Sequence, residues 1–89
     1  MPERVITVPA GVGLHARPAA VFVQAAMALP ADVTVAKPDG APVSAKSILS
    51  VLGLDVRGGE QVVLRADGEG AEEALESLAG VIAASGDHG

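Results

Sequence analysis

The chain has 89 residues, so we expect a single domain, residues 1–89, and its lack of cysteine excludes disulfide scaffolds and thiolate chemistry. Apolar residues make up 49% but include only one Phe, so a deep ligand cavity is not expected. The net charge of -5 disfavours a nucleic-acid partner. The sequence has no apolar run of ~20 residues and no signal peptide, which predicts a cytoplasmic protein with no membrane partner.

The first half of the chain predicts strand, helix, strand, strand. Residues 3–8 alternate, with Ile6 and Val8 on one face, and Pro9 ends that strand. From Ala16 to about Ala28 the apolar residues follow a helical period. Residues 32–37 and 41–44 are predicted strands, joined by a Pro-Asp-Gly turn as a hairpin.

The second half predicts helix, strand, helix. Ser47 can cap a short helix from Ile48 to about Leu52. Residues 60–66 are a fourth strand with Val62 and Leu64 facing inward, and residues 67–85 hold turn residues followed by an amphipathic helix. This order predicts an α+β domain, βαββαβα, with helices on one face of a mainly antiparallel sheet.

A histidine and an arginine stand together where a loop becomes the first helix. The first backbone N–H groups of a helix have no internal partner and attract anions. His15 lies at or beside the N-cap, and the guanidinium of Arg17 in the first turn can reach the same anion. Neutral imidazole is a nucleophile near neutral pH. This pattern suits a phosphoryl group held on the ring.

Other interpretations of these residues stay open at this point. A single histidine at a helix start is more often a solvated cap or loop residue. No metal site is expected, since the only other histidine, His88, lies in the tail. The glycines at 11 and 13 are not followed by Gly-Lys-Ser/Thr, so a phosphate-binding loop is not predicted.

The segments GLHARPAA (13–20) and SAKSIL (44–49) resemble the histidine-containing phosphocarrier family, HPr, of the phosphoenolpyruvate-dependent sugar phosphotransferase system. The resemblance extends over nearly the whole chain. It implies an open-faced β-sandwich in which three helices cover one face of four antiparallel strands. It also implies that His15 accepts phosphate at Nδ1 from enzyme I and passes it to sugar-specific enzyme II A components, without a cofactor.

The resemblance assigns further roles residue by residue. Ala16 and Arg17 are the expected phosphate-binding residues, and Arg17 acts with His15 in the transfer. Ser47 aligns with a regulatory serine that a dedicated kinase phosphorylates in some lineages. Position 12 is commonly a small polar residue in the family, whereas this chain has Val12, so the orientation of the histidine ring is open. Asp55 stands where glycine is frequent.

The short second helix carries more apolar residues than one sheet can bury. We expect Val51 and Leu54 to face the core and the others to form an exposed patch, unless loops cover it. Members of the family often carry lysine on the outer side of the first helix, where this chain has Gln24 and Met27. The expected docking surface consists of Ala20, Gln24, Met27, Ile48, Leu49 and Leu52.

Two functions compete. The first is a monomeric phosphocarrier that is a covalent intermediate rather than an enzyme. The second is a regulatory HPr-like binding module that acts through Ser47 and the helix 48–52 surface, with a serine kinase and transcriptional regulators as partners. A third, weaker possibility is a small ligand-binding domain without phosphate chemistry.

Overall fold

The computed structural model describes residues 2–9 and 16–84, and within them four strands form one antiparallel sheet. The strands are β1 (Glu3–Thr7), β2 (Asp32–Ala36), β3 (Val43–Ser44) and β4 (Gln61–Asp67), in the spatial order β1-β4-β2-β3. The register places Val5 opposite Val63 and Val35 opposite Leu64. The antiparallel sheet and the hairpin between β2 and β3 are therefore confirmed.

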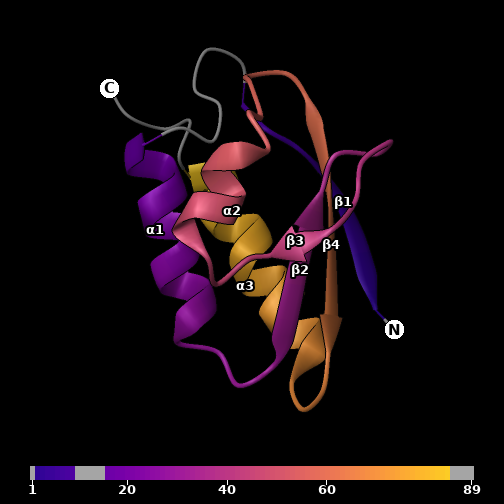
Figure 1. The fold of residues 1–89 in the computed structure, drawn as a ribbon. Coiled ribbons are helices and arrows are strands. Elements are labelled where there is room, and N and C mark those ends of the chain that lie inside the picture. The colour runs from indigo at the N-terminus through magenta and orange to yellow at the C-terminus, as the bar shows by residue number, and fades with distance from the viewer. Residues whose placement is uncertain (1, 10–15, 85–89) are drawn as a thin grey trace.

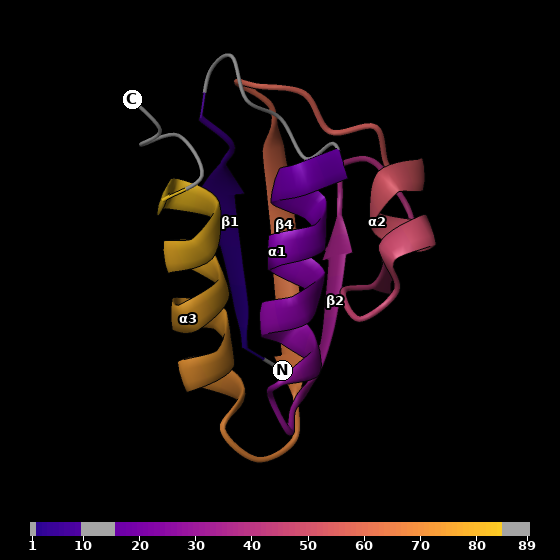
Figure 2. The same cartoon turned by 90° about the vertical axis from the view of Figure 1, so that its left-hand side faces the viewer.

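Three helices cover one face of this sheet: α1 (Ala16–Met27), α2 (Ile48–Gly53) and α3 (Ala71–Ala84). Figure 1 shows the helices as a layer on one side of the strands, and Figure 2 shows α1 lying between α3 and α2. Within residues 2–9 and 16–84, no helix lies on the other face of the sheet. This is the expected open-faced sandwich in the order βαββαβα.

The core lies between the sheet and the helices. Strand β4 alternates as expected, so Val62, Leu64 and Ala66 are buried while Gln61 and Arg65 face solvent. The largest fully buried side chains include Phe22 of α1, and Leu78 and Ile82 of α3. Within the described residues no polar or charged side chain is buried, so apolar packing alone fills the core.

Local chemistry explains where the elements begin. The strand expected over 41–44 is shorter, Val43–Ser44, and Pro42 has no N–H with which to extend the ladder. Gly68 and Gly70 have positive φ, which glycine adopts without steric cost, and α3 begins directly after them. Asp55, at the position where glycine is frequent, does take a left-handed conformation (φ 52°).

Several parts of the fold meet at one end of the molecule. Figure 2 shows the end of β1, the start of α1 and the segment from α2 to β4 at the same end of the helix layer. Because β1 ends at Thr7 and α1 begins at Ala16, the segment with the expected phosphorylated histidine belongs between them. This end is the candidate site.

Candidate functional site

The candidate site is centred on the first turn of α1. That helix begins at Ala16 and has twelve residues, so its first N–H groups lack intrahelical partners and favour an anion at this end. There is no acidic residue in the first turn to compete for those groups. His15 and Val12 lie outside the described residues, and for Ala16 and Arg17 only the backbone is described.

Ser47 caps α2, as expected. Its backbone is extended (φ -113°, ψ 112°), and its Oγ accepts a hydrogen bond from the N–H of Ser50 at 3.3 Å. The carbonyl of Ser47 accepts from the N–H of Val51 at 3.0 Å, which begins the helix. Ser47 itself is partly exposed. The hydroxyl therefore has a structural role while staying at the surface.

Lys46 connects the start of α2 to the end of α1 by a hydrogen bond. Its Nζ donates to the carbonyl oxygen of Leu29 at 3.0 Å, and this contact is partly buried. Leu29 lies just after α1, where helix carbonyls have no intrahelical partner and favour a cation. The contact joins two segments that each carry part of the expected docking surface.

The apolar surface on α2 is exposed as expected. Leu49 is 80% exposed, and Ile48 and Leu52 are 36% and 38% exposed, whereas Val51 is fully buried. Leu54 packs, partly buried, against the core. The alternative that loops cover the patch is wrong for Leu49. The apolar residues of this six-residue helix spread around about half of its circumference, and of these only Val51 is buried in the core.

On α1, the expected docking residues also lie at the surface. Met27 is 63% exposed, Gln24 is exposed and Ala20 is partly buried. Helices α1 and α2 contact each other, so the two halves lie on neighbouring helices (Figure 2). The sequence reasoning missed Val21, which is exposed; its position three residues before Gln24 was the available signal.

The loop between α2 and β4 is held together by Glu60. Its Oε1 accepts a hydrogen bond from the backbone N–H of Arg57 at 2.8 Å and lies 3.5 Å from Nζ of Lys37. The hydrogen bond from Arg57 lowers the pKa of Glu60 from its ordinary value; desolvation opposes this, and Lys37 adds to the lowering. The carboxylate is therefore ionised at neutral pH.

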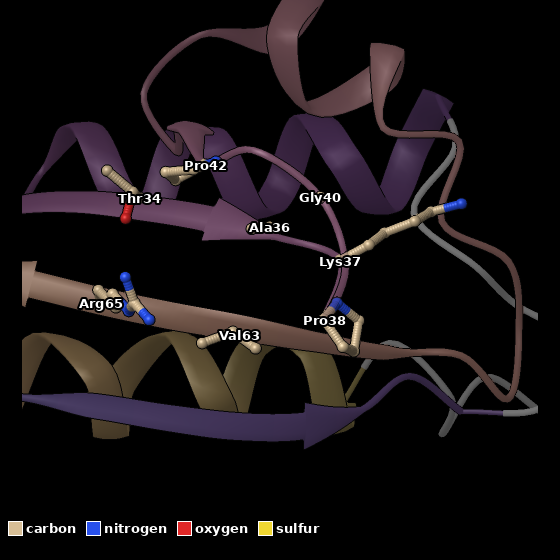
Figure 3. Close-up of a pocket in the computed structure, with 8 residues that line it drawn as sticks. All are labelled: Thr34, Ala36, Lys37, Pro38, Gly40, Pro42, Val63 and Arg65. Carbon is tan, nitrogen blue, oxygen red and sulfur yellow. The ribbon is translucent and has the colours of Figure 1, made fainter.

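Two hollows lie away from the candidate site. One, of about 60 Å³, is on the open sheet face, and Figure 3 shows Val63, Pro38 and Arg65 around it, with Lys37 extending away from it. The other, of about 260 Å³, lies between the first strand and α3. Arg65 is already paired with Glu3 at 2.8 Å. Neither hollow includes an expected site residue.

Residues 2–9 and 16–84 also bear on metal binding and on the membrane. In these ranges no cluster of three or more His, Asp or Glu side chains could hold a metal ion. None of the three helices described is long and apolar enough to cross a membrane.

Comparisons with known proteins agree with this fold. A family model described as "PTS HPr component phosphorylation site" matches residues 2–84. The phosphocarrier protein HPr of Streptomyces coelicolor is 57% identical over 83 residues, which are 93% of this chain and 89% of that protein. A crystal structure of HPr-C-His from Thermoanaerobacter tengcongensis has a TM-score of 0.91 at 39% identity, covering 100% of this chain and 99% of that one.

A third relative bears on the regulatory alternative. The HPr-like protein Crh of Bacillus subtilis is 45% identical over 82 residues, which are 92% of this chain and 95% of that protein. Its crystal structure, described as a dimer with a swapped domain, has a TM-score of 0.74 at 44% identity and covers 96% of this chain and 97% of that one.

Proposed function

Because the chain belongs to the HPr family of phosphocarrier proteins, we propose that His15 accepts a phosphoryl group from enzyme I and passes it to sugar-specific enzyme II A components. The observation that carries this proposal is the match of the family model, described as "PTS HPr component phosphorylation site", to residues 2–84. In the sequence His15 directly precedes Ala16, the first residue of α1. The phosphoryl group originates in phosphoenolpyruvate.

The chemistry follows from the helix start. A neutral imidazole nitrogen of His15 attacks the phosphorus atom, and the bond between phosphorus and enzyme I breaks. The N–H groups of Ala16 and Arg17, and the Arg17 guanidinium, stabilise the phosphoryl oxygens. Each exposed helix-end interaction contributes only about 0.3–1 kcal/mol. Such modest stabilisation suits a carrier that must release the group again.

The docking surface of this carrier is formed by α1 and α2. Its six proposed residues, Ala20, Gln24, Met27, Ile48, Leu49 and Leu52, include no charged side chain. Burial of exposed apolar side chains such as Leu49 and Met27 then drives docking, and salt screens it little. We expect the KM of enzyme I for this protein to change less than about twofold between 0.05 and 0.5 M NaCl. A fall in affinity of tenfold or more would contradict an apolar interface.

Phosphoenolpyruvate and a general enzyme I test the carrier function. Wild-type protein should acquire one acid-labile phosphate, and His15→Ala should acquire none. His88→Ala is the matched control, because it removes the only other histidine and should label like wild type. Absence of label on wild type would reject the phosphocarrier function.

A second candidate function is a regulatory binding module that acts through Ser47 and α2. Its support is the similarity to Crh, together with the partly exposed position of the Ser47 cap. A phosphate on Ser47 would add a charge of about -1.5 to -2 beside the apolar patch and weaken docking there. Labelling of Ser47 by a serine kinase, in a protein that enzyme I does not label, would favour this function.

The proposed setting is the cytoplasm, and the proposed state of the single domain is a monomer. The alternative to a monomer is a dimer, and the crystal structure of Crh, described as a dimer with a swapped domain, is an example of one. Sedimentation equilibrium at micromolar concentration distinguishes a mass of 8.8 kDa from twice that value.

A further inference from the structure

Glu60 connects three segments that are distant in the chain. Its carboxylate accepts the hydrogen bond from the N–H of Arg57 and lies 3.5 Å from the ammonium of Lys37, which follows β2. Its backbone carbonyl accepts a hydrogen bond from the N–H of Val8 at 2.8 Å. One residue thus joins the loop after α2, the end of β2 and the end of the first strand.

The turn from Arg57 to Glu60 depends on this side chain. The N–H of Glu60 donates to the carbonyl of Arg57 at 3.1 Å, while the carboxylate accepts from the N–H of Arg57 at 2.8 Å. The turn is therefore closed in both directions. Gly59 within it has a φ of +89°, a conformation that only glycine adopts readily. Because both ends of the turn are hydrogen-bonded to each other, its backbone has few other conformations available.

This turn holds the backbone of Val8 on both sides. Val8 donates its N–H to Glu60, and its carbonyl accepts from the N–H of Gly59, each at 2.8 Å. The side chain of Val8 is fully buried in the core. Val8 is the last buried residue described before α1. The position and direction in which the chain leaves β1 toward α1 are therefore set by the turn.

The segment between Val8 and Ala16 is short and contains His15. At its far end, α1 is fixed in the core by Ala19 and Phe22, both fully buried. The other end of the same connection is the backbone of Val8, which the turn holds. Small misplacements of a reacting group can cost large factors in rate.

We propose that Glu60 is a positioning residue for phosphoryl transfer: through the turn 57–60 and Val8 it holds the start of the segment that leads to His15. This inference rests on the proposed function. Glu60 does not belong to the docking surface on α1 and α2, and it does not touch the phosphoryl group in this scheme. Its loss should therefore lower the maximal rate and leave docking almost unchanged.

The test compares Glu60→Ala and Glu60→Gln with Glu69→Ala and Glu69→Gln, which remove the same charge from an exposed residue between two glycines. Enzyme I and phosphoenolpyruvate phosphorylate each variant at several concentrations, well below its unfolding temperature. We expect Glu60→Ala to lower the maximal rate about three- to tenfold with KM within about twofold of wild type. Glu60→Gln, whose Oε1 can still accept from Arg57, should recover most of the rate.

A second measurement separates positioning from a general loss of stability. Amide hydrogen exchange should become at least about tenfold faster at Val8 and Gly59 in Glu60→Ala, while the amide of Ala74, which bonds to Gly70 in α3, keeps its protection. The NMR signals of the His15 ring should shift in the same variant. The Glu69 variants should match wild type in both measurements.

The results of the kinetic and exchange measurements distinguish the possible roles of Glu60. Equal maximal rates in the Glu60 and Glu69 variants, or unchanged exchange at Val8 and Gly59, would overturn the positioning role while leaving the phosphocarrier function intact. A uniform increase in exchange that includes Ala74 would show a purely structural role. If wild-type protein takes no phosphate, the proposed function itself fails, and the positioning role fails with it.

Discussion

Helices α2 and α3 are both rich in apolar residues but use them differently. In α3 the apolar residues recur at helical spacing, and Leu75, Leu78 and Ile82 are all buried, with glutamates on the opposite side. In α2 they spread well beyond the side that faces the core, so Val51 is buried while Leu49 stays 80% exposed. Helix α3 therefore builds the core, and α2 keeps apolar surface that folding does not use.

Burial distinguishes the apolar residues that pack the fold from those that stay available to a partner. Apolar residues that obey the helical period are explained by burial against the sheet. Apolar residues that break the period, as Leu49 does, need another partner, because exposed apolar clusters mark interaction sites. Matched leucine substitutions in the two helices test this distinction.

The largest effect is expected for Leu78→Ala in α3. Leu78 is fully buried, so its truncation leaves a cavity and should lower the free energy of unfolding by about 2–5 kcal/mol. Urea denaturation monitored by circular dichroism measures this. A loss below about 1 kcal/mol would mean that α3 does not carry the core in the way described.

Leu49→Ala makes the same chemical change in α2. Stability should stay within about 0.5 kcal/mol of wild type, because the side chain is mostly exposed already. The KM of enzyme I for the protein should instead rise about tenfold, which corresponds to about 1.4 kcal/mol of lost apolar burial at the interface. Steady-state phosphorylation kinetics measure this. A large stability loss with an unchanged KM would reverse the roles assigned to the two helices.

The residues of α2 show which structural features could be predicted from the sequence alone. The crowding of apolar residues in 48–54 predicted that Val51 would face inward and that Ile48, Leu49 and Leu52 would lie outside, and the structure agrees. The same holds for the cap by Ser47, because an N-cap is a local feature. Local patterns and the helical period contain this information.

Contacts between distant segments could not be predicted in the same way. The bond from Lys46 to the carbonyl of Leu29 and the pairing of Glu60 with Val8 and Lys37 depend on how the elements pack in three dimensions. No residue pattern near Glu60 marks it, because the two glycines before it indicate a turn but not which side chain closes that turn. The roles of His15 and Arg17 came from the family motif and remain proposals.

A smaller effect is expected at the start of α2. Ser47→Ala removes the acceptor for the N–H of Ser50 and should lower the free energy of unfolding by about 1 kcal/mol. Ser47→Asp retains a capping oxygen and should recover most of that loss. Ser77→Ala, at an exposed position inside α3, is the control and should change stability by less than about 0.5 kcal/mol. Thermal unfolding of wild type and these three variants tests the expected order of their stabilities.

The smallest effect is expected from acid acting on the loop after α2. The hydrogen bond from Arg57 lowers the pKa of Glu60 from its ordinary value in the folded protein, so its ionised form stabilises the fold. That contribution is fully present above the unfolded value and is lost as the pH falls through the lowered folded pKa. As the pH falls from 6 to 3, the free energy of unfolding measured by urea denaturation should therefore decrease slightly less in Glu60→Gln than in Glu69→Gln. Identical slopes would mean that the carboxylate of Glu60 does not hold its turn, and the loop that follows α2 would then owe its shape to its backbone alone.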